Sequence, residues 1–593
     1  MKKKKTTAQA AFNKSRKSGE AKAPRAAFNG RFVKDPDKIT DAATGRTRLI
    51  DAILAADLQT AQRLLESGAS PNKATKEGKA PLHYAARLGQ TDMIALIASY
   101  GAQTNPRDKT QRTPLHDALE APQALRVIGA LIRHGGNANI ADNTGRLPLH
   151  HAAAGSSNAV VRRLLKHTDN PNTPDKAYAQ PLHLAAESNS IDVVQTILFE
   201  RVAVFSANQK GDTALHLAAM RGDPEMAQFL LKTDAVQMVN AVNLDGRTPL
   251  HAAIKSGNEK LVRAMVEAGG DTNLADRSGM TALHEAVMGN NPRIVKFLID
   301  SGAHVSRLPR NVKTPALVLA IQQRRSERIL QHLMDAGADV NTPNDDGQTP
   351  LMAAASRGDA ALVSLLLGSG ADPAVTDKHG QNVLHYCTTG IPAAQVEVMI
   401  RGGANVNAKS AWGRTALVAA VQERNITLAE TLLKHGADPK VADAQGATPL
   451  HAALQLRNTS LINLLIEKGA DVNAAAHYSK LTPLHLACHQ GMEREAQKLL
   501  EKGANPNAQD NLGRTPLMNL MQGGYVNAEL VRNMLKHGAD PLQEDQFGTN
   551  AYDMAHNQRK AVVVEMFRQH GLKKSARPYN PKPPRPPWGG GFY

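Results

Sequence analysis

Residues 448–451 read Thr448-Pro449-Leu450-His451, and close variants of this motif return about every 33 residues along the chain. Further copies stand at 113–116, 248–251 and 482–485. A fixed period of this length is the sequence signature of a repeat array, in which each repeat buries its apolar face against its neighbours. The period therefore predicts that the 593 residues form stacked small units rather than several globular domains.

The leucine of the motif, or the residue in its place, marks one position in each unit and is called the anchor. Sixteen anchors follow one another at spacings of 33 to 35 residues: Leu49, Leu82, Leu115, Leu149, Leu182, Leu215, Leu250, Leu283, Ala316, Leu351, Leu384, Leu417, Leu450, Leu484, Leu517 and Tyr552. The first and last units lack the Pro and His of the motif. Such atypical end units are expected, because one side of each faces water.

Each part of a unit has a local physical reason. Thr is a favourable residue immediately before a helix, and Pro suits the first helical position, where no N–H donor is needed. The motif therefore opens one helix. A second helix follows, with an apolar stripe such as Leu461, Leu464 and Leu465 at helical spacing.

Glycine recurs at two places in the linker between units, at the end of the second helix and in the turn that follows. The second helix ends in Gly-Ala-Asp or a variant of it, and Gly is the residue that closes a helix in the left-handed conformation. These glycines are Gly68, Gly302, Gly337, Gly370, Gly436, Gly469, Gly503 and Gly538. Asp345-Asp346-Gly347 and Asn511-Leu512-Gly513 then favour tight hairpin turns. Three consecutive units, near residues 166–169, 200–202 and 232–234, lack the closing Gly, so their helices must end differently.

The combined pattern, Gly-x-Thr-Pro-Leu-His-x-Ala-Ala followed by Leu-Leu-x-x-Gly-Ala-Asp-x-Asn, resembles the ankyrin repeat over roughly residues 45–570. The resemblance implies an all-α solenoid of helix-turn-helix units with β-hairpin fingers. It also implies that the histidine of the motif is structural and hydrogen-bonds the backbone of the adjoining hairpin. These histidines are His83, His116, His150, His183, His216, His251, His284, His385, His451 and His485.

Charge divides the chain into three parts. Residues 1–40 carry a net charge of +9 and residues 571–593 a net charge of +5, which leaves +3 of the total +17 for the residues between. Both tails lack an apolar stripe, and we expect them to be disordered. The domain prediction is a basic disordered tail at 1–40, a repeat array of about sixteen units at 41–570, and a basic Pro/Gly-rich disordered tail at 571–593.

Two cysteines, Cys387 and Cys488, cannot build a disulfide framework, which fits a reducing cytoplasm. No transmembrane segment or secretory signal is expected. The prediction is therefore a cytoplasmic protein, with export into a host cell without a signal peptide as the alternative. A monomer is expected.

Candidate partner-binding residues are sought at the finger tips, because binding residues favour loops held by a rigid scaffold. The candidates are Trp412, Tyr478, Tyr178 and Phe547 at predicted tips, with Arg307 and Arg310 on the finger before the unit anchored at Ala316. Exposed Trp and Tyr are common anchors of protein interfaces.

No phosphate-binding, metalloprotease, nucleophile-elbow or kinase motif occurs in the chain, so no enzyme activity, cofactor, metal or small-molecule substrate is predicted. The favoured function is a scaffold that binds partner proteins through its fingers and concave helix face. Within this class, a bacterial effector acting on host proteins and an ordinary cytoplasmic scaffold both stay open. The alternative function is weak binding of nucleic acid or an anionic membrane surface through the basic tails.

Overall fold

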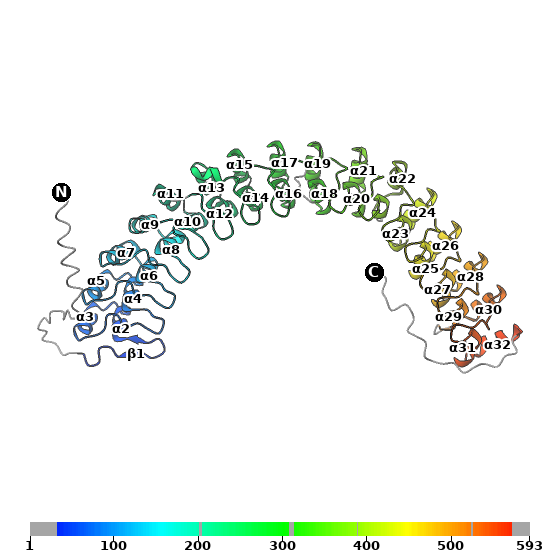
Figure 1. The fold of residues 1–593 in the computed structure, drawn as a ribbon, viewed down its shortest axis with the longest axis horizontal. Helices are drawn as coiled ribbons and strands as arrows, with labels where there is room; N and C mark the ends of the chain where they lie inside the picture. The colour runs from blue at the N-terminus through cyan, green and yellow to red at the C-terminus, as the bar shows by residue number, and fades with distance from the viewer. Residues whose placement is uncertain (1–32, 201–203, 307–313, 388–389, 523–525, 572–593) are drawn as a thin grey trace. The chain divides into compact units, whose positions relative to one another are not determined.

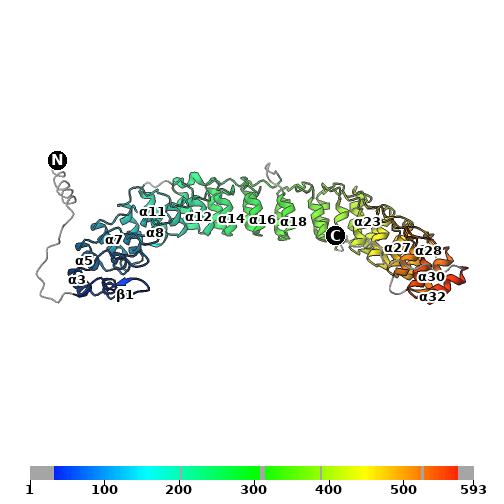
Figure 2. The ribbon, with the colours of Figure 1, turned by 60° about the horizontal axis from the view of Figure 1, so that its bottom comes forward.

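The computed structural model describes residues 33–200, 204–306, 314–387, 390–522 and 526–571. The chain divides into two compact units, residues 1–285 and 286–593, each described here by itself. Within each, antiparallel helix pairs stack side by side and are joined by projecting fingers (Figures 1 and 2). The prediction of an all-α repeat array is confirmed, and the described residues form sixteen helix pairs.

The first unit opens with a short hairpin and continues as helix pairs. Its inner helices, which open with the repeated motif, are α2 (Arg48–Leu54), α4 (Pro81–Arg87), α6 (Pro114–Asp117) extended by η1 (Ala118–Glu120), α8 (Pro148–Gly155), α10 (Pro181–Glu187), α12 (Ala214–Arg221) and α14 (Pro249–Ser256). Its outer helices are α3 (Leu58–Glu66), α5 (Thr91–Ser99), α7 (Ala124–Arg133), α9 (Asn158–Leu165), α11 (Ile191–Phe199), α13 (Pro224–Leu231) and α15 (Glu259–Glu267).

The second unit repeats the arrangement, and α16 (Ala282–Met288) contains the boundary between the two. Its inner helices are α18 (Ala316–Gln322), α20 (Pro350–Ser356), η3 (Val383–Tyr386), α23 (Ala416–Gln422), α25 (Pro449–Gln455), α27 (Pro483–His489), α29 (Pro516–Gln522) and α31 (Ala551–Asn557). Its outer helices are α17 (Pro292–Asp300), α19 (Glu327–Asp335), α21 (Ala360–Gly368), α22 (Ala393–Arg401), α24 (Ile426–Lys434), α26 (Thr459–Glu467), α28 (Glu493–Glu501), α30 (Ala528–Lys536) and α32 (Ala561–Gln569).

The core of each unit lies between the inner and outer helices. All sixteen anchor residues are buried, and the small residues around them let adjacent inner helices approach closely. Leu450 on α25, for example, is fully buried, as are Leu461 and Leu465 on the outer helix α26. Burying each such side chain contributes about 2 kcal/mol, so packing between layers supplies most of the stability of these short helices.

The helix ends close largely as the sequence predicts. Each of the eight closing glycines has a positive φ, for example 90° at Gly436. In the loop that follows, Asn407 links two layers, because its Nδ2 donates to Gly436 O at 2.9 Å and its Oδ1 accepts from Asp438 N at 2.8 Å. Two of the three outer helices of the first unit that lack the glycine use threonine instead: Thr168 Oγ1 donates to Leu164 O, and Thr233 Oγ1 donates to Leu230 O. The extra residues after Thr233 form η2 (Asp234–Met238).

The fingers are tight turns rather than extended ribbons. Among the described residues, paired strands occur only in β1 (Ile39–Asp41) and β2 (Arg46–Thr47), which form an antiparallel hairpin. Other fingers are closed by a single backbone pair such as Asp443 N to Ala447 O at 2.9 Å. Successive fingers approach closely, since His477 N donates to Gln445 O at 2.7 Å.

The prediction of disorder for residues 1–40 is wrong for residues 33–40, the part of that segment that the structure describes. Val33 N donates to Ser67 Oγ at 3.0 Å, and Asp37 Oδ1 accepts from Ser70 N at 2.9 Å. Asp37 thus makes the same layer-to-layer bond that asparagines make elsewhere in the array, and β1 pairs with β2. The remaining residues of both predicted tails, apart from Gly571, lie outside the described residues.

In the part of the chain that the structure describes, no helix has both the length and the apolar composition needed to span a bilayer.

The close approach of fingers makes a specific prediction for glycine. Gly446 has a φ of 78°, and a Cβ at this position would lie 2.6 Å from His477 N on the next finger. Gly436 has a similar φ of 90° but no atom within 4 Å of its Cβ position. Replacing either by Ala costs about 1–2 kcal/mol for the left-handed backbone. We expect Gly446→Ala to cost a further 1–3 kcal/mol or so, measured by chemical unfolding. Equal losses in the two variants would contradict the finger contact.

Candidate protein-interaction surface

The side chain of the first finger residue fixes the shape of most fingers, although the longer finger at 476–481 begins with Ala476 and is closed by its backbone. Asp443 Oδ1 accepts hydrogen bonds from the backbone N–H of Gln445 at 2.9 Å and of Ala447 at 3.0 Å. Asp545 Oδ1 accepts in the same way from Phe547 at 2.9 Å and Thr549 at 2.9 Å. An Asp or Asn here satisfies backbone donors that the tight turn leaves unpaired. The third residue is thereby held at the tip, where its side chain is not used by the turn.

Backbone hydrogen bonds connect each finger to the next through the second and third positions. Ala444 N donates to Trp412 O at 2.9 Å, and Gln546 N donates to Leu512 O at 3.0 Å. Because backbone atoms make these contacts, the identity of the tip side chain is free to vary without changing the stack.

The tips of the last six fingers of the second unit carry mostly aromatic and apolar side chains. We call these residues the fingertip row: His379, Trp412, Gln445, Tyr478, Leu512 and Phe547. Trp412 is 54% exposed, Tyr478 81% and Phe547 59%. Trp412 also stacks on His379 of the preceding finger, with ring centroids 5.3 Å apart. Large rings left in water on neighbouring and alternate fingers of one row are the feature expected of an interaction surface.

The same position in the first unit is polar or small. It carries Glu77, Thr110, Thr144, Ala177, Lys210, Asp245 and Ser278. The aromatic row is therefore a property of one part of the array and not a consequence of the fold.

The other predicted binding residues do not join the fingertip row. Tyr178 is 62% exposed, but it lies in the first unit and fills the fourth finger position, where most fingers have Gly and where its φ is 58°. Its role in binding stays a prediction. Arg307 and Arg310 lie outside the described residues.

The histidines of the motif lie in the interior. Each Nδ1 accepts the backbone N–H of the residue three positions earlier, at 3.0–3.3 Å, in His83, His116, His150, His183, His216, His251, His284, His385, His451 and His485. All are buried except His385, which is half-buried. The predicted capping bond of the threonine forms at Thr213, whose Oγ1 accepts His216 N, but not at Thr448. Thr448 Oγ1 lies 2.8 Å from His451 Nδ1.

The other ring nitrogen reaches the next repeat. His451 Nε2 lies 3.1 Å from Leu481 O, and His216 Nε2 lies 2.9 Å from Arg247 O, each at the end of the following finger. Since Nδ1 accepts a backbone N–H, the proton of the neutral ring must sit on Nε2 and be donated to the carbonyl. Burial lowers the pKa of these rings, to about 4 for His116 and His150, so the neutral form persists.

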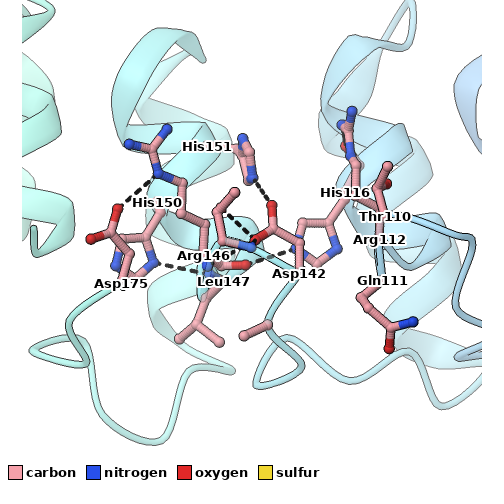
Figure 3. Close-up of polar contacts among 12 residues, drawn as sticks. Thr110, Gln111, Arg112, His116, Asp142, Arg146, Leu147, His150, His151 and Asp175 are labelled. Atoms are coloured by element: carbon pink, nitrogen blue, oxygen red, sulfur yellow. Dashed lines mark hydrogen bonds and ion pairs between the residues drawn. The ribbon is translucent and has the colours of Figure 1, made fainter. Parts of the chain in front are cut away.

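A charged network lies between fingers and inner helices of the first unit (Figure 3). Arg146 Nε donates to Asp175 Oδ2 at 2.9 Å, and His151 Nε2 lies 2.8 Å from Asp142 Oδ2. His151 directly follows the His150 of the motif, so it belongs to the surface of the inner helix that faces the fingers.

His116, Asp142 and His151 bring three possible metal-ligand atoms within 4.8 Å of one another. Their hydrogen bonds argue against a cation site. His116 uses Nδ1 for Thr113 N and Nε2 for Arg146 O, and Asp142 Oδ2 binds His151. A metal would have to break these links, so the group acts as a hydrogen-bonded connection between layers.

Sequence reasoning missed a cavity beside Tyr478, lined in part by Ala447, Leu481 and Leu486. These positions hold Arg or acidic residues in several other repeats, as at Arg112 and Asp117, but the sequence does not show that their replacement by small or apolar residues leaves a space between repeats. The two cysteines are both buried and free, and burial raises the pKa of the Cys387 thiol to about 12.

Comparison with known proteins supports the repeat architecture. A family model described as ankyrin repeats (3 copies) matches residues 49–142, 120–206, 182–276, 215–309, 317–395, 390–476 and 478–577. These matches cover most of the chain.

Similar curated proteins share only part of their length with this chain. Human Rabankyrin-5 is 28% identical over 203 residues, which are 33% of this chain and 14% of that protein. The NF-kappa-B p105 subunit of Gallus gallus is 30% identical over 159 residues, 27% of this chain and 13% of that protein. Protein PhlB of Serratia liquefaciens is 42% identical over 73 residues, 12% of this chain and 31% of that protein.

The buried neutral histidines predict a strong pH dependence of stability. Their folded pKa lies below the ordinary value of about 6.5, so the unfolded chain takes up protons first as the pH falls. The free energy of unfolding is therefore full above about pH 6.5 and falls as the pH decreases towards 4. Carboxylates contribute little in this window where hydrogen bonds hold them ionised. Asp142 is one such case: burial alone would raise its pKa, but bonds from Thr144 and His151 lower it to about 2.

The measurement is urea unfolding followed by helical circular dichroism between about pH 7.5 and pH 5. Repeating the series in high salt screens the repulsion of the net positive charge but not the burial of neutral rings. An unfolding midpoint that stays constant across this range would contradict the assigned protonation state.

Proposed function

This chain belongs to the ankyrin-repeat family, and we propose that it is a scaffold that binds partner proteins through the fingertip row of its second unit. The supporting observation is the exposure of Trp412, Tyr478 and Phe547 on alternate fingers of the row, whereas the fingertips of the first unit carry polar or small residues. Aromatic side chains supply large contact areas at low entropic cost, which makes them frequent anchors of protein interfaces.

The rigidity of the row supports the same function. Most tips are fixed by the carboxylate or hydroxyl of their finger and by a backbone bond to the next finger. Ser410 Oγ, for example, accepts from Arg414 N at 3.2 Å, and Trp412 O accepts from Ala444 N at 2.9 Å. A partner that binds several tips at once therefore orders few protein groups, which lowers the entropic cost of association.

The remaining functional predictions stay predictions. Ankyrin-repeat proteins are typically binding scaffolds without enzyme activity, and the chain spans only a small share of the curated relatives it matches. A bacterial effector role is tested by a secretion reporter fused to the C-terminal residues. Binding of nucleic acid or anionic membranes would depend on tails that lie almost wholly outside the described residues.

Removing two rings of the row tests the proposed surface. We expect a tagged Trp412→Ala, Phe547→Ala double variant to recover its partners from the source cells at least about tenfold less than the unmodified chain, because each ring is an exposed anchor. Recovery is quantified by affinity purification with mass spectrometry. Phe199→Ala, which removes an exposed ring at the end of the outer helix α11 and outside the row, is the control.

The thermal midpoint should be unchanged in all variants, since the removed rings are not part of the core. Undiminished recovery of the same partners by the double variant would exclude the fingertip row as the binding surface.

A further inference from the structure

A cavity of about 200 Å³ opens beneath the tip of Tyr478 in the second unit. Two fingers, residues 443–447 and 476–481, form its sides, and the inner helices α25 and α27 form its base. Its apolar wall consists of Ala447, Ala476, Leu481 and Leu486.

In two layers of the first unit an ion pair fills the corresponding space. The last finger residue is Arg112 in one repeat, where its guanidinium lies 3.8 Å from Asp117 and 3.1 Å from Glu120. It is Arg247 in another, where Nη2 lies 3.1 Å from Glu285 Oε1.

At the cavity the same positions are apolar. Ala447 and Leu481 stand where Arg112 and Arg247 stand in their repeats, and Leu486 follows the motif histidine as Asp117 and Glu285 do. The opening thus arises because both partners of the ion pair are replaced, so that neither a long side chain nor a charge remains to fill it.

The volume suits one side chain. Sites for drug-sized small molecules usually measure about 300–1,000 Å³, which is larger than this cavity. A dry apolar cavity of about 150 Å³ can hold a benzene molecule. A space of about 200 Å³ therefore matches an aromatic or branched aliphatic side chain.

The residues that line the cavity disfavour a charged occupant and offer hydrogen-bond partners to a peptide backbone. Among the described residues that line the cavity there is no Asp, Glu, Lys or Arg, and a charge buried there without a partner would be costly. The amide side chains of Gln445, Gln455 and Asn511 stand in the same lining. Amides offer both donors and acceptors, which match the N–H and C=O groups of a peptide backbone.

We propose that this cavity binds the uncharged apolar anchor residue of an extended peptide segment in the partner protein, with its backbone held by the surrounding amides. The proposal rests on the proposed function and specifies the chemistry of the partner. The exposed ring of Tyr478 stands at the cavity, so the same segment can continue from the cavity onto the fingertip row.

The probe for this proposal is a phage-displayed library of random linear peptides, sorted on the full-length protein. We expect the enriched peptides to share one aromatic or branched aliphatic residue at a fixed position, with no charged residue accepted there. Ala447→Arg restores the residue type found at this position in other repeats and fills the cavity. It should weaken these peptides at least about tenfold.

Ala179→Arg is the matched control, because Ala179 is the last residue of a finger in the first unit, where its backbone bonds to Asp175 N. It should leave binding unchanged. A second, milder pair compares Gln455→Ala with Gln422→Ala, since both glutamines are exposed and each ends an inner helix, but only Gln455 lines the cavity. We expect a loss of roughly threefold to tenfold for Gln455→Ala alone.

The outcomes separate this proposal from the broader one. If Trp412→Ala with Phe547→Ala abolishes partner recovery while Ala447→Arg has no effect on peptides or partner, the scaffold function stands and the cavity assignment is overturned. Enrichment of peptides with a charged anchor would also overturn it. So would preferential, Ala447→Arg-sensitive binding of a synthetic peptide of residues 572–593, because the occupant would then be the chain's own segment.

Discussion

Eight histidines of the array each bind two repeats at once, and the order of the stack depends on this pair of bonds. In His451 the Nδ1 atom accepts Thr448 N at the start of its own helix, while Nε2 reaches Leu481 O at the base of the next finger. The ring can do both only when it is neutral and carries its proton on Nε2. Helix start, finger position and protonation state are therefore set by one side chain, in layer after layer.

Because the base of a finger is fixed in this way, the side chain at its tip contributes little to the stability of the stack. The first residue of a finger orders the turn, and glycine at the fourth position permits the close approach of the next finger, as at Gly446. Little of the stack depends on the side chain between them. Sequence change can therefore accumulate at the tips at small cost to the fold, and Trp412 and Phe547 occupy such positions.

The sequence was sufficient for the repeat architecture because local rules determine it. Pro449 at a helix start and Gly436 at a helix end act through their own backbone, and both occur with the period of the array. The exposed rings of Trp412 and Tyr478 were also predictable, since tip positions follow from the turn residues. The cavity was not, because it results from what Ala447 and Leu481 do not supply, and its walls come from different repeats. The closure of a helix by Thr168 was also missed, since threonine occurs at helix starts as well as at helix ends and so does not predict a closing hydrogen bond.

The direction of the histidine bond has a consequence for dividing the array. Where the Nε2 proton is donated to the repeat that follows, as in His451, a fragment ending on the histidine-bearing repeat would leave a buried donor without its acceptor. The last repeat of the chain has no such histidine: Asp553 follows its anchor, and Asn550 Oδ1 accepts Asp553 N at 2.8 Å instead. Leu317, Met352, Val418 and Met518 stand in the histidine position of four internal repeats. Those repeats are the natural ends for stable shorter fragments, and the motif thus encodes where the molecule can be cut as well as how it stacks.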